Sequence, residues 1–141
     1  NPSLHQTQGG SNDAPVGQYA EWLALRVLGG KLESNSAKSY DLTTTDLKRI
    51  QIKARVVRKP AKPGERQLST FRSFDFDGAL VLLFDDTYHV RRATILTPDV
   101  VIANSRESSH VNGRIFIARD ALLDLGADLT DQFVDAEDTL V

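Results

Sequence analysis

The chain contains no cysteine and no methionine among its 141 residues. Without cysteine it has no disulfide bond, no zinc–thiolate site and no cysteine nucleophile, which fits a cytoplasmic setting. No apolar run approaches the roughly 20 residues that a membrane-spanning helix needs, so we expect no membrane insertion. The start of the chain lacks the basic and then apolar segments of a signal peptide. Because the chain begins at Asn1 and has no methionine, we expect a processed or excised segment.

Sequence patterns that mark several enzyme classes are absent as well. The chain has no GxSxG nucleophile elbow, no P-loop, no GxGxxG dinucleotide motif and no HExxH zinc motif. Its composition, with 40% hydrophobic and 26% charged residues, is typical of a soluble globular protein. The length fits one domain with a substantial core.

Charge is strongly segregated along the chain, although the net charge is only −2. Between residues 48 and 72 there are nine basic residues and a single acid, Glu65. Such density favours a polyanion partner, because each neutralised phosphate releases condensed counterions, whereas the alternative interpretation is a solvated loop. We expect nucleic acid to contact Lys48, Arg49, Arg55, Arg58, Lys59, Lys62, Arg66 and Arg72.

The sign of the charge reverses after Arg119, where seven acids follow without a basic residue. This acidic end has two interpretations. It either mimics nucleic acid and competes for the basic surface, or it aids solubility.

Hydrophobic periodicity and turn residues predict an α/β domain over residues 14–129. The expected elements are helices over 14–28, over 98–105 and from 120, and strands over 39–43, 49–57, 78–84, 88–96 and 114–118. This order predicts a mixed central sheet of about five strands flanked by helices. Residues 1–13 are polar and aperiodic, so we expect disorder there, and we expect an acidic flexible tail over 130–141.

Four polar side chains stand out against this pattern. Glu21 falls inside the apolar arc of the first helix, where a carboxylate is costly unless something compensates it. The segments 39–43 and 49–57 form a hairpin in this interpretation. If Asp41 pairs across from Gln51, both side chains share one face with Lys53, because side chains alternate along a strand.

Glu21, Asp41 and the triplet Gln51-Ile52-Lys53 resemble the core of the PD-(D/E)xK, or restriction-endonuclease-like, nuclease superfamily. The resemblance covers residues 17–57 by motif and residues 74–118 by the order of elements. Gln51 replaces the middle acid of the triplet, which bears on metal affinity more than on the fold. The resemblance implies a restriction-endonuclease-like core and a Mg²⁺-dependent deoxyribonuclease, with Mn²⁺ as a substitute. A restriction-type or a repair-type endonuclease fits equally well.

The resemblance also implies a role for each residue. Asp41 would be the main metal ligand, Gln51 would offer its side-chain oxygen, Ile52 its main-chain carbonyl, and Glu21 would complete the set directly or through water. These are the hard oxygen ligands that Mg²⁺ prefers. Lys53 would lie beside the attacking water, so the implied catalytic residues are Glu21, Asp41, Gln51 and Lys53. Cutting both strands of DNA requires two sites, which predicts a homodimer or other subunits of a longer system.

Two other functions remain compatible with the sequence. One is a non-catalytic DNA-binding or assembly module that retains the nuclease fold while Gln51 weakens the metal site. The other is a protein-interaction domain whose basic loop meets an acidic protein. Arginine, serine and threonine side chains commonly contact phosphates or base edges, and four of them stand near the end of the basic stretch, at Ser69, Thr70, Arg72 and Ser73. Asp75 and Asp77 are either solvated acids or a support for the site.

Overall fold

The structure, a computed structural model, describes residues 14–34 and 39–139. The disorder expected for residues 1–13 falls outside the described residues. Within them, no helix has both the length and the apolar character needed to cross a membrane.

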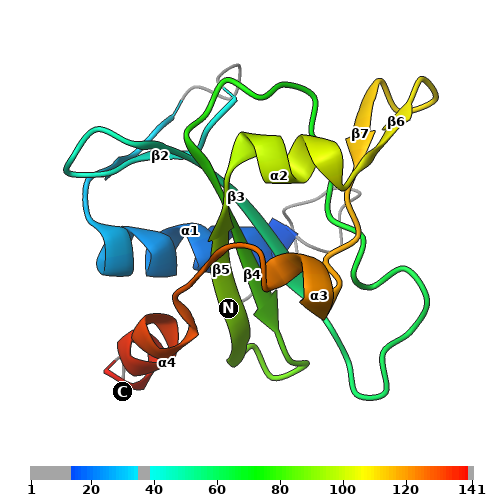
Figure 1. The fold of residues 1–141 in the computed structure, drawn as a ribbon. Helices are drawn as coiled ribbons and strands as arrows, with labels where there is room; N and C mark the ends of the chain where they lie inside the picture. The colour runs from blue at the N-terminus through cyan, green and yellow to red at the C-terminus, as the bar shows by residue number, and fades with distance from the viewer. Residues whose placement is uncertain (1–13, 35–38, 140–141) are drawn as a thin grey trace.

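The described residues form an α/β arrangement around a mixed six-stranded sheet in the order β1-β2-β3-β4-β5-β8 (Figure 1). Neighbouring strands are antiparallel except for β3 and β4, which are parallel. The strands of this sheet are β1 Lys31–Leu32, β2 Leu42–Thr43, β3 Arg49–Val56, β4 Gly78–Phe84, β5 Val90–Leu96 and β8 Ala127–Asp128. A separate hairpin pairs β6 Arg106–Ser108 with β7 Gly113–Ile115. The helices are α1 Ala14–Leu28, α2 Pro98–Ala103, α3 Asp120–Leu123 and α4 Thr130–Asp138.

The central strand β4 is buried along its whole length, as its unbroken apolar sequence predicts. Because its side chains alternate, Leu80, Leu82 and Phe84 join a core cluster with residues of α1 and α4. Ala79, Val81 and Leu83 join a second cluster with residues of α2 and α3. Helix α1 accordingly lies on one side of the sheet and α2 and α3 on the other (Figure 1). The sheet thus separates two hydrophobic cores.

The crossover between the parallel strands β3 and β4, residues 57–77, contains no helix or named strand. Four apolar side chains of this crossover segment are buried in the second core, namely Val57, Leu68, Phe71 and Phe76. Its backbone is held by hydrogen bonds from the amide of Leu68 to the carbonyl of Phe116 and between Phe71 and Arg114 in both directions. Buried side chains and backbone hydrogen bonds therefore hold this irregular segment across the face of the sheet.

Two expected elements differ from the structure. The strand expected over 114–118 does not enter the central sheet, because β7 pairs with β6 and the residues beyond it bond the crossover segment. The helix expected from residue 120 ends after one turn, and β8 takes the sixth position in the sheet. Gly126 permits this close return of the chain, since a Cβ there would lie 2.5 Å from the carbonyl oxygen of Ile95.

The segment expected to be a flexible tail over 130–141 differs as well. Residues Thr130–Asp138 form α4, which packs on β5 and α1. Phe133 is fully buried, and Leu129 and Ala136 pack against the same core. These apolar residues recur at helical spacing among the acids, and this pattern explains the helix. Residues 140 and 141 lie outside the described residues.

Candidate active site

Asp41 directly precedes β2 and lies opposite Gln51, which is near the start of β3. The antiparallel pairs of β2 and β3 are Leu42 with Ile50 and Thr43 with Arg49, and this register continues to place Asp41 across from Gln51. The Asp41 carboxylate oxygen Oδ2 accepts hydrogen bonds from the backbone amide of Ile52 at 2.7 Å and from Nε2 of Gln51 at 3.3 Å. The ladder between β2 and β3 covers only two residue pairs. Beyond it, the Asp41 carboxylate accepts the hydrogen bond of the Ile52 amide in place of a backbone carbonyl.

Glu21 projects from α1 toward this same place. Burial raises the pKa of the Glu21 carboxyl, and repulsion from the Asp41 carboxylate raises it further. Burial also raises the pKa of Asp41, while the Ile52 amide and the Lys53 ammonium oppose that rise. Within the described part of the chain, the Glu21 side chain has no hydrogen bond or ion pair of its own. The two partly buried carboxylates therefore lie close enough for the charge of Asp41 to act on Glu21.

Lys53 lies on the face of β3 that carries Gln51, and it is only 8% exposed. Its Nζ donates to Oγ of Ser69 at 2.8 Å and to the main-chain carbonyl of Thr70 at 3.1 Å. The ammonium also lies 4.7 Å from the centroid of the Phe71 ring, a cation–π distance. Burial lowers its pKa to about 8, against the attraction of Asp41, and Arg72 lowers it further. The crossover segment thus holds this buried amine in a fixed position.

The donor atoms of this cluster suit a hard divalent cation. Among residues 14–34 and 39–139, no three or more Asp, Glu, His or Cys side chains come together as a metal-binding group. Mg²⁺ does not need three, because one or two carboxylates and several waters commonly hold it. Glu21 and Asp41 supply two carboxylates, and a cation between them would offset the repulsion that raises the pKa of Glu21.

Gln51 requires a change of orientation to be a ligand. Its Nε2, a donor, faces Asp41 in the structure. Turning the amide group over presents Oε1 in its place, and the terminal torsion of glutamine is broad enough to allow this. The residues therefore fit a Mg²⁺ ion held by Asp41, Glu21, Gln51 and the Ile52 carbonyl.

Folding neutralises part of the basic stretch predicted to bind nucleic acid. Arg49 pairs with Asp75 at 2.5 Å and with Asp77 at 3.3 Å. Arg58 forms an ion pair with the buried Glu65. Because Asp75 and Asp77 lie beyond the basic run, its summed charge does not reveal that they neutralise Arg49.

Arg66 and Arg55 are also engaged. Arg66 pairs with Asp120 at 3.1 Å and donates to the carbonyl of Ala118 at 2.7 Å. Arg55 donates to the carbonyl of Gln67 at 2.5 Å. The remaining predicted residues have exposed side chains that form no ion pair or hydrogen bond within the described part of the chain; they are Lys48, Lys59, Lys62 and Arg72.

Sequence reasoning did not identify the partners of Lys53. The sequence offers Ser69 and Thr70 as possible phosphate or base contacts, and in the structure the Ser69 hydroxyl and the Thr70 carbonyl accept hydrogen bonds from the Lys53 ammonium. Ser69 and Thr70 lie 16 and 17 residues after Lys53, and no helix or strand period relates positions that are separated by an irregular segment. Comparison of the chain with models of known protein families gives no match, and comparison with curated protein sequences gives none either. The function proposed next therefore depends on the arrangement of side chains.

Proposed function

We propose that the protein is a Mg²⁺-dependent deoxyribonuclease that hydrolyses phosphodiester bonds, acting as a restriction-type or repair-type endonuclease. One observation carries this proposal. Glu21, Asp41 and Lys53 lie close enough for Asp41 to influence the pKa of both of the others, and the Gln51 amide contacts the same carboxylate. The mixed sheet, with Asp41 and the Gln51-Ile52-Lys53 triplet on adjacent segments, supports a restriction-endonuclease-like core.

Each residue has a distinct task in this proposal. The carboxylates of Asp41 and Glu21 hold the cation, and the Ile52 amide fixes the orientation of Asp41. When bound, Mg²⁺ supplies positive charge against the charge that develops on the phosphoryl oxygens. Lys53 has three N–H donors, of which Ser69 and Thr70 use two. The third orients the attacking water or stabilises a phosphoryl oxygen in the transition state.

The burial of Lys53 strengthens this role. An ammonium removed from water interacts more strongly with charge in its neighbourhood, because the local dielectric constant is lower. With a pKa of about 8, the amine remains mostly protonated at pH 7. It is therefore a preorganised positive charge near the Asp41 carboxylate.

A cleavage assay tests the proposal. Purified protein is incubated with plasmid and oligonucleotide DNA in Mg²⁺ or Mn²⁺, and Asp41→Asn and Lys53→Met are compared with the parent. These variants keep the size of each side chain while removing its charge. We expect the parent to cut DNA, EDTA to abolish cutting, and each variant to lose about 100-fold or more of the rate.

Two controls remove similar charges elsewhere. Asp86→Asn, in the turn between β4 and β5, and Lys31→Met, on the edge strand β1, alter exposed residues and are expected to cut at the rate of the parent. Cleavage that persists in Asp41→Asn and Lys53→Met would assign the activity to a contaminant or to another site. A parent that cuts neither DNA nor RNA would refute the nuclease proposal.

A second candidate function is a non-catalytic DNA-binding or assembly module. Gln51 favours it, because an amide replaces a carboxylate and donates to Asp41 in the structure. This function predicts salt-dependent DNA binding by the parent and the same binding by Lys53→Met, with no cleavage in any divalent ion. The assay above, combined with a binding measurement, separates the two candidates.

A further inference from the structure

A small pocket of about 90 Å³ lies where β3 ends, beside α3. Two apolar residues and four charged ones line it, namely Val57, Leu83, Arg66, Arg91, Arg92 and Asp120. Three guanidinium groups lie around one pocket, and like charges repel one another. An anion close to them would offset this repulsion.

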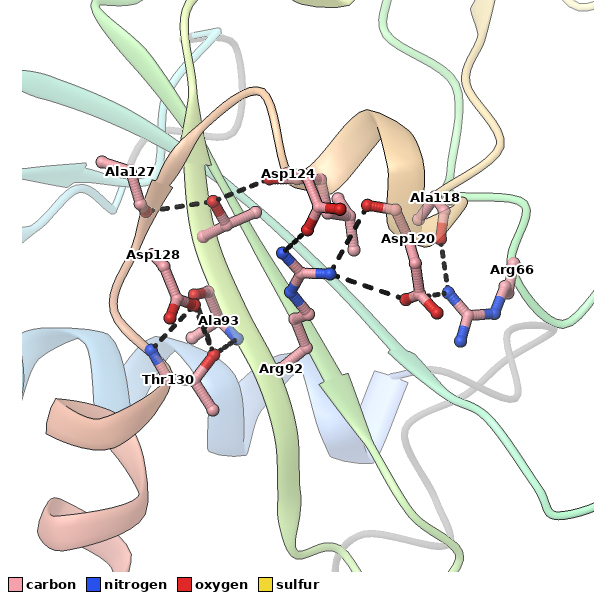
Figure 2. A network of polar contacts seen from close by, with 11 residues as sticks. Arg66, Arg92, Ala93, Ala118, Asp120, Asp124, Ala127, Asp128 and Thr130 are labelled. Carbon is pink, nitrogen blue, oxygen red and sulfur yellow. Dashed lines mark hydrogen bonds and ion pairs between the residues drawn. The ribbon is translucent and has the colours of Figure 1, made fainter.

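Part of that compensation comes from acids on and next to α3 (Figure 2). Arg92 donates to Asp124 at 2.6 Å and lies 3.6 Å from Asp120, which also pairs with Arg66 at 3.1 Å. Arg91 has no acid within ion-pair distance in the described part of the chain. Its Nη1 donates only to the carbonyl of Val57, at 3.4 Å. The cluster therefore has three cations and two acids, and Arg91 accounts for the unbalanced charge.

The pocket lies on the same side of the sheet as Lys53. Side chains alternate along β3, so Lys53, Arg55 and Val57 follow one another on one face. The separation of Lys53 and Val57 along the strand is about 13 Å at the usual rise per residue. One stretch of the crossover segment reaches both places, since Arg66 contacts the pocket acid while Ser69 and Thr70 contact Lys53.

We propose that the pocket formed by Arg66, Arg91 and Arg92 binds a backbone phosphate of the nucleic acid at a distance from the bond that is cut. The inference rests on the proposed function and adds a second place at which the protein contacts the nucleic acid. Each strand of a duplex carries one phosphate per about 3.4 Å of helix axis, so a point about 13 Å from the scissile phosphate lies within a few nucleotides of it along the backbone. A strand whose scissile phosphate lies at Lys53 would therefore bring a nearby phosphate of the same backbone to the pocket.

Arginine suits this task because its planar guanidinium donates two parallel hydrogen bonds to a phosphate. Asp120 and Asp124 hold Arg66 and Arg92 in place, so little side-chain entropy is lost when the phosphate binds. The same acids also repel the ligand. Removing the charge of Asp120 should therefore strengthen binding, while removing the charge of Arg91 should weaken it.

Binding is measured by fluorescence anisotropy with a labelled DNA duplex, in EDTA and in the Asp41→Asn background, so that no cleavage occurs. Adding Arg91→Gln should raise Kd about eightfold at 0.1 M salt and lower the salt slope by about one, which is the contribution of a single phosphate contact. Adding Asp120→Asn should lower Kd. The matched controls Arg106→Gln on β6 and Asp131→Asn on α4 change the net charge equally and should shift Kd much less.

The outcomes separate this inference from the nuclease proposal. If Arg91→Gln behaves like Arg106→Gln while the parent still cuts DNA, the pocket is not a phosphate site and the nuclease survives. If Arg91→Gln weakens binding but the parent never cuts, the pocket stands and the nuclease fails. A competition with inorganic phosphate adds a further test. Arg91-dependent binding of free phosphate, without an effect on the duplex, would assign the pocket to a small anion and overturn the inference.

Discussion

At the scale of single residues, the main feature is a buried amine with three partners. A lysine that is 8% exposed pays a large desolvation penalty, which is why its pKa falls to about 8. The Ser69 hydroxyl, the Thr70 carbonyl and the Phe71 ring compensate part of that penalty. All three belong to one irregular stretch. The position of Lys53 therefore depends on a segment that also carries exposed, basic residues.

Ser69 is predicted to be a positioning residue for Lys53. Ser69→Ala removes a hydrogen bond to a charged group, and kcat for DNA cleavage should fall about 10- to 100-fold, because such a bond contributes about 1.5–3 kcal/mol. KM should change little. Ser69→Thr keeps the hydroxyl and should restore much of the rate, whereas Ser109→Ala, at an exposed position between β6 and β7, serves as the control. A rise in KM at unchanged kcat would instead mean that Ser69 contacts the substrate.

The sequence predicts some residue contacts and not others. Asp41 opposite Gln51 follows from hairpin pairing and from the two-residue period of strands, both of which are local. Glu21 could be singled out because an acid on an apolar helix face needs a partner. The capture of Lys53 by Ser69 could not be predicted, because it depends on how the crossover segment docks against Phe116 and Arg114.

At the scale of elements, the crossover segment covers one face of the sheet without forming a helix or a named strand. Glu65 stabilises it by accepting backbone hydrogen bonds from Arg58 at 2.9 Å and from Lys62 at 3.0 Å, together with the ion pair to Arg58. These contacts hold the pKa of Glu65 below its usual value, with the two backbone amides as the largest causes. One carboxylate thus ties the two ends of a proline-containing turn.

Glu65 should therefore make stability depend on pH. A carboxyl whose folded pKa is depressed stabilises the fold above its unfolded pKa, near 4.5, and loses that contribution as pH falls through the lower folded value. Thermal unfolding at pH 7 should show Glu65→Gln melting below the parent. The gap should shrink as the pH falls below about 4. An equal gap at pH 7 and pH 3 would mean that the carboxylate charge is not what stabilises the segment.

Elements with a long apolar pattern, such as α1 and β4, agree with the sequence predictions. The C-terminal elements β8 and α4 were not predicted. The helix over 14–28 and the buried strand over 78–84 coincide with α1 and β4. Helix α4 was missed because its acids outweigh a narrow apolar stripe around Phe133. The edge strand β8 has two residues, too few for any period to be recognised.

At the scale of the whole molecule, folding rearranges the charges that the sequence segregates. The basic stretch loses part of its charge to Asp75, Asp77 and Asp120, which lie 26 to 54 residues from their partners. What remains is the exposed set Lys48, Lys59, Lys62 and Arg72, together with the arginine pocket beside α3. The α/β class and the mixed sheet were predictable from element order. The charge pattern on the surface was not, because ion pairs between distant segments decide it.

The central claim is that α1, the residues before β2 and the start of β3 together form one cation site. Isothermal titration of the metal-free protein with Mn²⁺, in competition with Mg²⁺, tests it without relying on cleavage. The parent should bind the ion, and Asp41→Asn and Glu21→Gln should each weaken binding about tenfold or more, because each removes a charged ligand. Asp86→Asn should bind as the parent does. Equal affinity in all four proteins would contradict the account, since Glu21 and Asp41 would then not share a cation.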